Sequence, residues 1–334
     1  MDHAADQRAT LPTTLRALYA PVVDELEQVE AILRRELSSD NPFVDGLVKH
    51  GFRLGGKRLR PALVLLSARA TGGIRPEHLA LGAMVELIHT ATLVHDDVLD
   101  EATLRRHLDT VNARWDNEAS ILLGDYLFAR AICLASSLDD PFAIRAISAS
   151  ARSMCEGELK QVQSRGNYDL TEADYLEIIA GKTAALTACS CRVGAHYAGA
   201  SPEVSEALAQ YGHNLGIAFQ IADDLLDLQG DEATAGKSLG TDLLKQKATL
   251  PLIRLLDTVS PPDRVELISI LSRSGNHHRD ALRPWFDRSD AIAYARRQAR
   301  LFTQRADAGL ASLPATPALD SLRGLTDFVV TRHQ

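Results

Sequence analysis

Residues 80–106 read ALGAMVELIHTATLVHDDVLDEATLRR, and this stretch decides the fold. Its first part is apolar or small on most faces of a helix, and helices of this kind lie inside a bundle. Asp96 and Asp100 then follow one helical turn apart, and Asp97 lies within reach of the same face. Like charges at this spacing destabilise a helix, so we expect a cation to offset them.

The rest of the chain predicts further helices and few strands. The 334 residues are 46% hydrophobic, and valine and isoleucine seldom alternate with polar residues as strands require. Apolar residues recur at helical spacing over 13–38, 60–71, 77–103, 117–136, 140–164, 171–198, 202–229, 246–256, 263–273, 289–312 and 317–331. Thr171 and Ser201 are suitable N-caps. We therefore predict an all-α protein with a single domain over residues 13–334. Residues 1–12 and the loop 230–240 lack apolar periodicity and are expected to be flexible.

Composition argues against several classes of function. The net charge of −8 makes nucleic acid an unsuitable partner. We find no apolar run of membrane-spanning length and no secretory signal, and so expect a cytoplasmic protein without a transmembrane segment. Four cysteines lie in apolar segments without zinc-site spacing, and we interpret them as buried free thiols in a reducing compartment. They are Cys133, Cys155, Cys189 and Cys191.

A second acidic cluster repeats the spacing of the first. Residues 219–227 read FQIADDLLD, so Asp223, Asp224 and Asp227 end another apolar segment. A lone cluster could equally be a helix cap or a solvated acidic face. Two clusters at the ends of buried helices are better explained as two walls of one metal site. A set of carboxylates without histidine or cysteine suits Mg²⁺. Water molecules and phosphate oxygens then complete the coordination of the ion.

Basic segments elsewhere supply donors for phosphate. In GFRLGGKRLRP, residues 51–61, Gly55 and Gly56 permit a close approach of the backbone before three cations. Each basic segment alone could be an ordinary helix start or a set of surface ion pairs. Together they could hold two diphosphates, one bridged by metal and one held by lysine and arginine only. The candidate cations are Lys57, Arg58, Arg60, Arg105, Arg106, Lys182, Lys237, Lys245 and Lys247.

These motifs together resemble the trans-isoprenyl diphosphate synthase (polyprenyl synthetase) family. The match runs through GGKRLRP, the stretch 80–106, NEASILLGDYLFARA, EGE, GKTAAL, FQIADDLLD, GKSLGTDL and KATLPLI, in this order. The resemblance implies an isoprenoid-synthase bundle of helices around a deep central cavity, usually as a homodimer. It implies a Mg²⁺-dependent prenyltransferase that condenses an allylic diphosphate head to tail with isopentenyl diphosphate. Such a reaction proceeds by ionisation, attack on the allylic cation and loss of a proton.

The resemblance also implies roles for single residues. About three Mg²⁺ ions would be bound, and their ligands would be Asp96, Asp100, Asp223 and Asp227, with Asp97 and Asp224 completing the clusters. Isopentenyl diphosphate would be bound by Lys57, Arg60, His89 and Arg106. The allylic diphosphate would be bound by Arg105, Lys182, Lys247 and Lys237. Thr183 and Gln220 would lie beside the allylic carbon and stabilise the cation with their dipoles. Without the resemblance, His89 would be interpreted as a core histidine.

Two departures from the family pattern concern diphosphate affinity. His107, Leu108 and Asp109 stand where the family usually has Gly-Lys-Pro. We therefore expect a less sharply turned loop that lacks the usual lysine. Gln246 replaces the glycine that usually precedes Lys247. Neither change removes a metal ligand, so catalysis is expected to remain.

Small residues one turn before the first cluster favour a long product. The growing chain would run alongside the 77–103 helix, so Ala91 and Thr92 would line its path. Bulky aromatic residues there would block it. We favour an all-trans-polyprenyl diphosphate of roughly C30 to C50, used as a quinone side chain. The alternatives are that the small residues only permit close helix packing, and that the product is of farnesyl or geranylgeranyl length.

Two rival hypotheses use the same features. A class I terpene cyclase also has an aspartate-rich helix and Mg²⁺, but the second D-D-x-x-D and the GGKR segment argue against it. A non-catalytic subunit of a heteromeric synthase would be expected to lose one acidic cluster. This chain keeps both clusters.

Overall fold

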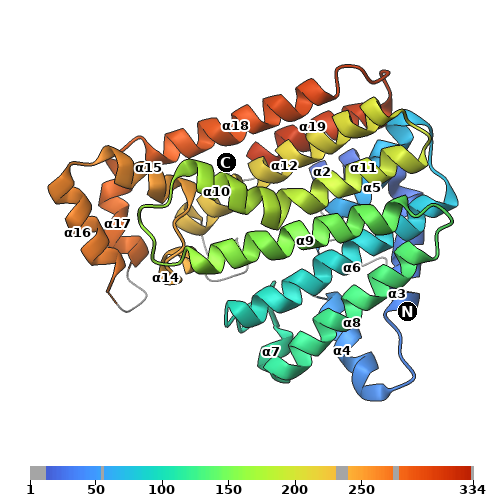
Figure 1. Cartoon of the computed structure of the whole chain (residues 1–334), viewed down its shortest axis with the longest axis horizontal. Helices are drawn as coiled ribbons and strands as arrows, with labels where there is room; N and C mark the ends of the chain where they lie inside the picture. The colour runs from blue at the N-terminus through green and yellow to red at the C-terminus, as the bar shows by residue number, and fades with distance from the viewer. Residues whose placement is uncertain (1–12, 54–55, 231–239, 274–277, 332–334) are drawn as a thin grey trace.

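The computed structural model describes residues 13–53, 56–230, 240–273 and 278–331. These residues form helices and one two-stranded hairpin, which confirms the predicted all-α fold. Most of the long helices run roughly along the long axis of the molecule (Figure 1). Residues 1–12 and most of the loop 230–240, both predicted to be flexible, lie outside the described residues. Lys237 lies outside them as well.

The helices and strands divide between the two halves of the chain. In the first half they are α2 (Thr13–Tyr19), η1 (Ala20–Val22), α3 (Val23–Glu36), α4 (Pro42–Arg53), α5 (Leu59–Thr71), α6 (Pro76–Leu99), β1 (Leu104–Arg105), β2 (Leu108–Asp109), α7 (Val111–Arg114), α8 (Asn117–Ser136) and α9 (Phe142–Gln163). In the second half they are α10 (Glu172–Ile179), the π-helical turn η2 (Ala180–Ala184), α11 (Ala185–Tyr197), α12 (Pro202–Gln229), α14 (Thr241–Leu244), α15 (Leu250–Thr258), α16 (Pro261–Leu271), α17 (His278–Asp287), α18 (Ala291–Gly309) and α19 (Pro317–Thr331).

Helical periodicity placed the long helices well and missed four shorter ones. The ranges 117–136, 202–229 and 317–331 agree with α8, α12 and α19. Thr171 and Ser201 cap α10 and α12, accepting from Asp174 N and Val204 N. Helices α4 and α17 were not predicted, and neither were the four-residue helices α7 and α14. Glycines interrupt the apolar pattern of α4, and Pro284 lies inside α17, and both residue types weaken a helical signal.

Helix α6 is a central helix of the bundle, as its apolar sequence predicts. It packs against α3, α5, α8 and α11, and its side chains from Leu81 to Ile88 are almost completely buried. Helix α12 packs likewise between α11 and α18. The two acidic clusters therefore end two helices that the core holds in place.

The chain after α6 turns sharply, so the expectation of a less sharp turn was wrong. Helix α6 ends at Leu99 rather than at residue 103, and β1 pairs with β2 with Arg105 opposite Leu108. The two residues between them, Arg106 and His107, both have positive φ, 52° and 62°. This is the two-residue turn that normally takes glycine or asparagine. His50 on α4 anchors the hairpin, because its Nε2 donates to the Asp109 carbonyl at 2.7 Å.

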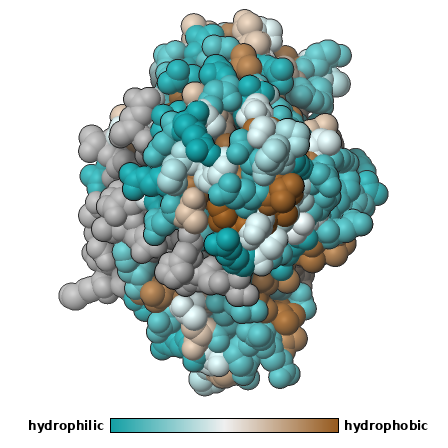
Figure 2. All heavy atoms as spheres, turned by 90° about the vertical axis from the view of Figure 1, so that its left-hand side faces the viewer, coloured by the Kyte–Doolittle hydropathy of each residue, from teal (hydrophilic) through white to brown (hydrophobic). Residues whose placement is uncertain are grey.

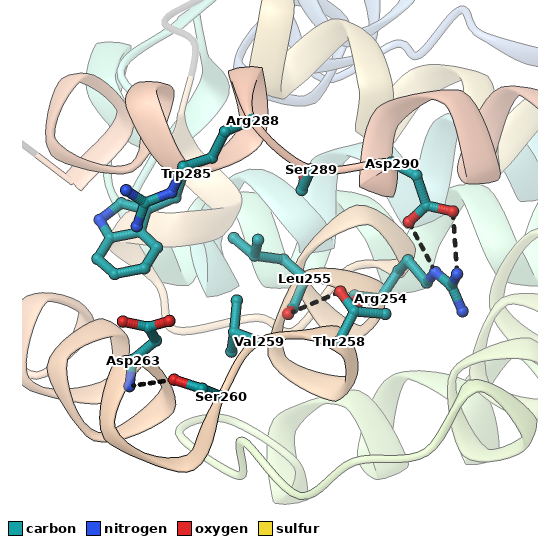
Figure 3. A pocket seen from close by; sticks show the side chains of 10 residues that line it. All are labelled: Arg254, Leu255, Thr258, Val259, Ser260, Asp263, Trp285, Arg288, Ser289 and Asp290. Carbon is teal, nitrogen blue, oxygen red and sulfur yellow. Dashed lines mark hydrogen bonds and ion pairs between the residues drawn. The ribbon is translucent and has the colours of Figure 1, made fainter.

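Helices α15, α16 and α17 surround a second, smaller hydrophobic cluster. Figure 2 views the molecule from the end where these helices lie, and that face is largely hydrophilic with scattered apolar patches. A cavity of 490 Å³ opens between them (Figure 3), where two hydrogen bonds of 2.9 Å join Arg254 to Asp290. Another cavity of 410 Å³ is lined by α12, α18 and α19. No predicted site residue that the structure describes lines either one, so the deep central cavity stays a prediction.

Two predictions drawn from composition need correction. Cys189 and Cys191 are buried, but Cys133 and Cys155 are exposed, because the outward faces of α8 and α9 are themselves partly apolar. Among the described helices, α8 is long and apolar enough to cross a membrane by length and composition. Its Leu123 and Leu127 are nonetheless buried, and the helix packs along α6.

Candidate active site

The first acidic cluster ends α6, and its three aspartates have different surroundings. Asp97 is buried, and its two oxygens accept hydrogen bonds from Arg105 Nε at 2.9 and 3.1 Å. Asp96 is half-buried, and Asp100 forms the C-cap of the helix. Asp97 therefore fixes Arg105 in place, while Asp96 and Asp100 interact with lysines from the second half of the chain.

Asp96 lies in the field of Lys182, which the π-helical turn η2 carries. Burial raises the pKa of Asp96 to about 6, against the attraction of Lys182 and with the help of Glu158. The Lys182 ammonium pairs with Glu158 at 2.6 Å and donates to Gln161 at 2.9 Å. Single π-helical turns inside α-helices are frequent at functional sites. Here the turn carries both Lys182 and Thr183, two of the predicted site residues.

Two glycines allow α9 to approach η2 closely. A Cβ atom on Gly157 would lie 2.5 Å from the backbone nitrogen of Lys182. A Cβ atom on Gly181 would lie 2.8 Å from the carbonyl oxygen of Ser153. Both distances are too short for real carbon contacts. The EGE segment thus has a physical role, since Gly157 allows the contact and Glu158 binds Lys182.

A chain of hydrogen bonds joins η2 to the second acidic cluster. The Thr183 hydroxyl donates to Gln220 Oε1 at 2.7 Å, and Gln220 Nε2 donates to Asp224 Oδ1 at 2.8 Å. Asp224 Oδ2 accepts from the buried hydroxyl of Tyr175 at 2.6 Å. Burial, together with nearby Asp242, raises the pKa of Asp224 to about 8. Asp224 therefore orients Gln220, and both of its oxygens already have donors.

The Asp227 carboxylate is hydrogen-bonded to the start of α14. Its two oxygens accept from the Thr241 hydroxyl at 3.0 Å and from Asp242 N at 3.1 Å, and its side chain is buried. The prediction that Asp227 binds metal stays a prediction, while in this structure its carboxylate anchors α14. Asp223 is the half-buried member of the second cluster.

Lys247 links the two acidic ends. Its ammonium lies 3.2 Å from Asp100 Oδ1 and 3.8 Å from Asp242 Oδ1. Lys245 also contacts Asp100 Oδ1, at 2.8 Å. Burial alone would raise the pKa of Asp100, but Lys247 and Lys245 lower it to about 2. The ends of α6 and α12 are thus brought together through the segment 240–247.

The predicted isopentenyl diphosphate residues also gather in one place. A Cβ atom on Gly56 would overlap the Arg106 guanidinium, so this glycine lets Arg106 lie against the loop before α5. Burial lowers the pKa of Arg60 to about 10, and Arg60 Nε is buried without a hydrogen-bond partner. Burial and the guanidinium groups of Arg60 and Arg106 lower the pKa of His89 well below its usual value. A partly buried guanidinium whose buried Nε is an unused donor suits an anion.

A buried charge network holds the loop that carries Lys57. Arg58 has φ of 52° and pairs with Glu30, and with Glu86 at 2.7 Å. The Tyr19 hydroxyl donates to the carbonyl of Lys57 at 3.0 Å. Because α2, α3 and α6 all contribute partners, the backbone between Lys57 and Arg60 is firmly placed.

The donor set of the acidic ends fits Mg²⁺. Asp96, Asp100 and Asp223 offer hard carboxylate oxygens. Within the ranges that the structure describes, no three acidic, histidine or cysteine side chains converge tightly enough to hold an ion alone. Magnesium commonly uses one or two carboxylates together with water and substrate phosphates. Carboxylates that are distributed over two helix ends are therefore suitable ligands for it.

The two residues predicted to control product length differ in exposure. Ala91 is completely buried in the core, while Thr92 is half-buried and lies one turn before Asp96. The Thr92 hydroxyl donates to the His89 carbonyl at 2.8 Å. Thr92 therefore shares the helix face of His89 and Asp96.

Sequence reasoning missed several partners of the predicted residues. They are Glu86, Gly157, Glu158, Tyr175, Asp242 and, in its contact with Asp100, Lys245. The EGE segment was a usable signal for Gly157 and Glu158. The other partners come from elements far apart in the chain, and no spacing indicates them.

The fold and the paired acidic ends define the class of α-helical isoprenoid synthases. A family model described as polyprenyl synthetase matches residues 41–286. An all-trans-nonaprenyl-diphosphate synthase (geranyl-diphosphate specific) of Rhodobacter capsulatus is 36% identical, covering 95% of this chain and 98% of that protein. The octaprenyl diphosphate synthase of Escherichia coli is 36% identical, covering 93% of this chain and 96% of its own length.

A solved structure shares the architecture as well. The polyprenyl synthase from Caulobacter crescentus CB15, described as complexed with calcium and isoprenyl diphosphate, superposes with a TM-score of 0.90 at 36% identity. The comparison covers 96% of this chain and 98% of that one. The chain belongs to the polyprenyl synthetase family, and it is a prenyltransferase.

Proposed function

We propose that the protein condenses isopentenyl diphosphate head to tail with an allylic diphosphate, and that it does so with Mg²⁺. The observation that carries this is the meeting of the two acidic ends through Lys247, together with the unused buried donor of Arg60 in the basic cluster around His89. Long-chain relatives that match along nearly their whole length support a long-chain all-trans-polyprenyl product. A product of farnesyl or geranylgeranyl length is the alternative.

The chain's own groups have distinct tasks in this proposal. Arg105, Lys182 and Lys247 hold the allylic diphosphate, while Lys57, Arg60, His89 and Arg106 hold isopentenyl diphosphate. Asp96, Asp100 and Asp223 would hold Mg²⁺, which when bound stabilises the charge of the departing diphosphate. Asp97 and Asp224 position Arg105 and Gln220.

Two dipoles are placed to stabilise the allylic cation. The Thr183 hydroxyl donates its hydrogen bond to Gln220 Oε1, so the lone pairs of the hydroxyl oxygen can face the electron-poor carbon. Gln220 is itself fixed by Asp224. The double bond of isopentenyl diphosphate attacks the cation, and the departing diphosphate takes the proton that is lost. The apolar core around the site excludes water that would otherwise trap the cation.

Incubation of the purified chain with Mg²⁺, farnesyl diphosphate and labelled isopentenyl diphosphate tests the proposal. We expect label in products longer than geranylgeranyl diphosphate. Absence of incorporation from the chain alone would refute catalysis and favour a subunit that needs a partner. Products that stop at geranylgeranyl length would refute the long-chain assignment.

Enlarging the residue one turn before the first cluster is expected to shorten the product. Tyrosine at Thr92 places a ring on the face shared with His89 and Asp96, and tyrosine at Ala91 forces the adjacent core to shift toward that face. Chromatography of the prenyl products measures the length, and the first condensation onto a short primer serves as the control for intact chemistry. An unchanged product from both variants would place the floor of the cavity elsewhere.

We further propose that two copies of the chain associate through the outward face of α8. Ile121, Leu122 and Ile132 on this helix are 46%, 59% and 42% exposed, and a surface of large apolar residues favours association. Light scattering is expected to give the mass of a dimer for the wild type and a lower mass for Leu122→Asp. A wild-type monomer at micromolar concentration would contradict this. The cytoplasmic location stays a prediction.

A further inference from the structure

Lys245 contacts the first acidic cluster from the opposite half of the chain. It follows α14, and its ammonium lies 2.8 Å from Asp100 Oδ1 and also donates to the Asp100 carbonyl. Its side chain is 19% exposed. The roles proposed above give this lysine no task, although it touches one of the proposed metal ligands.

Two lysine ammonium groups contact Asp100, and they differ in whether a second carboxylate lies nearby. Lys247 approaches the same oxygen, Oδ1, at 3.2 Å, but it has a second carboxylate in Asp242 at 3.8 Å. Among the described residues, the ion-pair partner of Lys245 is Asp100. A divalent cation that takes this oxygen must displace the ammonium groups, because like charges repel strongly at such separations. Lys247 can then remain with Asp242, whereas Lys245 needs a new anion.

An allylic diphosphate would supply that anion. It would arrive with the metal at Asp100, and its oxygens would lie within the reach of a lysine that already contacts this residue. We propose that Lys245 is a further substrate-binding residue, which exchanges Asp100 for a diphosphate oxygen when a divalent cation binds Asp100. This inference rests on the proposed function.

The exchange predicts two effects of opposite sign. In Lys245→Met the apolar stem remains but the charge is lost. Without the competing ammonium, Mn²⁺ alone should bind roughly three- to tenfold more tightly. Inorganic diphosphate added to the Mn²⁺-loaded protein should bind more weakly by a similar factor. A lysine that only ties α14 to α6 would not tighten metal binding when removed.

Electron paramagnetic resonance of free Mn²⁺ and calorimetric titration of inorganic diphosphate measure both effects on the full chain. Lys245→Arg keeps the charge and should retain wild-type values for both. Lys160→Met is the matched control, because Lys160 is exposed and pairs with Glu177 on the surface. Thermal unfolding of each variant shows that the comparison is made between folded proteins.

Two results would overturn the inference. One is Mn²⁺ binding to Lys245→Met that is unchanged or weaker than in the wild type. The other is tighter Mn²⁺ binding with unchanged diphosphate affinity, which would leave Lys245 as a competitor without a substrate role. If Lys245→Met fails to fold, Lys245→Gln takes its place. Affinities of Lys245→Gln for Mn²⁺ and for diphosphate that equal those of the wild type would also overturn the inference. Neither measurement requires prenyl transfer, so failure of the proposed reaction remains distinguishable.

Discussion

Replacing Asp96 with asparagine is expected to reduce prenyl transfer by roughly a thousandfold while stabilising the metal-free protein. Asp96 is one of the carboxylates proposed to hold Mg²⁺, so its loss weakens stabilisation of the departing diphosphate. In the absence of metal the same carboxylate is unfavourable, because burial and neighbouring acidic groups raise its pKa to about 6. Asparagine has nearly the same shape without the charge. The gain in unfolding free energy at pH 7.5 should be on the order of 1 kcal/mol.

The stability gain should depend on pH with a defined sign. The pKa of Asp96 is about 6 in the folded chain against a model value of 3.8, so the folded state binds the proton more tightly. The cost of the carboxylate is therefore fully present above pH 6 and disappears as the pH falls toward 4. The difference in unfolding free energy between Asp96→Asn and the wild type should shrink as the pH falls from 6 toward 4. Thermal unfolding in a metal chelator, at several pH values, measures it.

A matched control is available on the surface. Asp125 on α8 is 67% exposed and forms a long contact of 3.6 Å with His95. Asp125→Asn should leave activity and stability nearly unchanged. If Asp96→Asn proved less stable than the wild type at pH 7.5, or kept full activity, the assignment of Asp96 as a half-buried metal ligand would be wrong.

Adding a single methyl group at Gly157 is expected to lower activity about a hundredfold. Its Cβ would lie 2.5 Å from the backbone nitrogen of Lys182 and 3.0 Å from the Ile178 carbonyl oxygen. Backbone atoms cannot rotate away, so α9 and η2 must separate. Lys182 and Thr183 would move with η2. We expect a loss of roughly 1 to 3 kcal/mol in the free energy of unfolding as well.

Gly46→Ala provides the comparison for this prediction. Gly46 also lies in a helix, α4, but a Cβ atom there meets nothing within 4 Å. Alanine at this position should stabilise the protein by about 0.5 to 1 kcal/mol without affecting turnover. Steady-state kinetics and denaturant unfolding of the two variants distinguish a steric effect at η2 from a general effect of alanine in helices. Wild-type turnover in Gly157→Ala would show that α9 does not position Lys182.

The sequence predicts the fold and the acidic ends well because both depend on local spacing. Helical periodicity located α6 and α12, and the two D-D-x-x-D spacings placed the carboxylates at their ends. Local patterns cannot tell which long-range partner a side chain has. Tyr175 binds Asp224 from a helix 49 residues earlier, and Lys245 contacts Asp100 across 145 residues. Such contacts are decided by packing.

The tight hairpin after α6 could not be predicted from the sequence, and the reason is different. A tight turn is normally signalled by glycine or asparagine, and here Arg106 and His107 take positive φ instead. The structure holds them because His50 binds the Asp109 carbonyl and Arg105 is held by Asp97. Tertiary contacts thus replace the missing local preference.

The π-helical turn η2 has a consequence for how such a site could arise. A π-helical turn holds one more residue than the regular helix around it, so a single-codon insertion in an ordinary helix can create it. Deleting one residue between Ala180 and Ala184 would restore a continuous helix from α10 to α11 and rotate one side of it by about 100°. Thr183 would then turn away from Gln220. In evolutionary terms, one inserted residue separates a plain packing helix from one that presents Lys182 and Thr183 to a substrate.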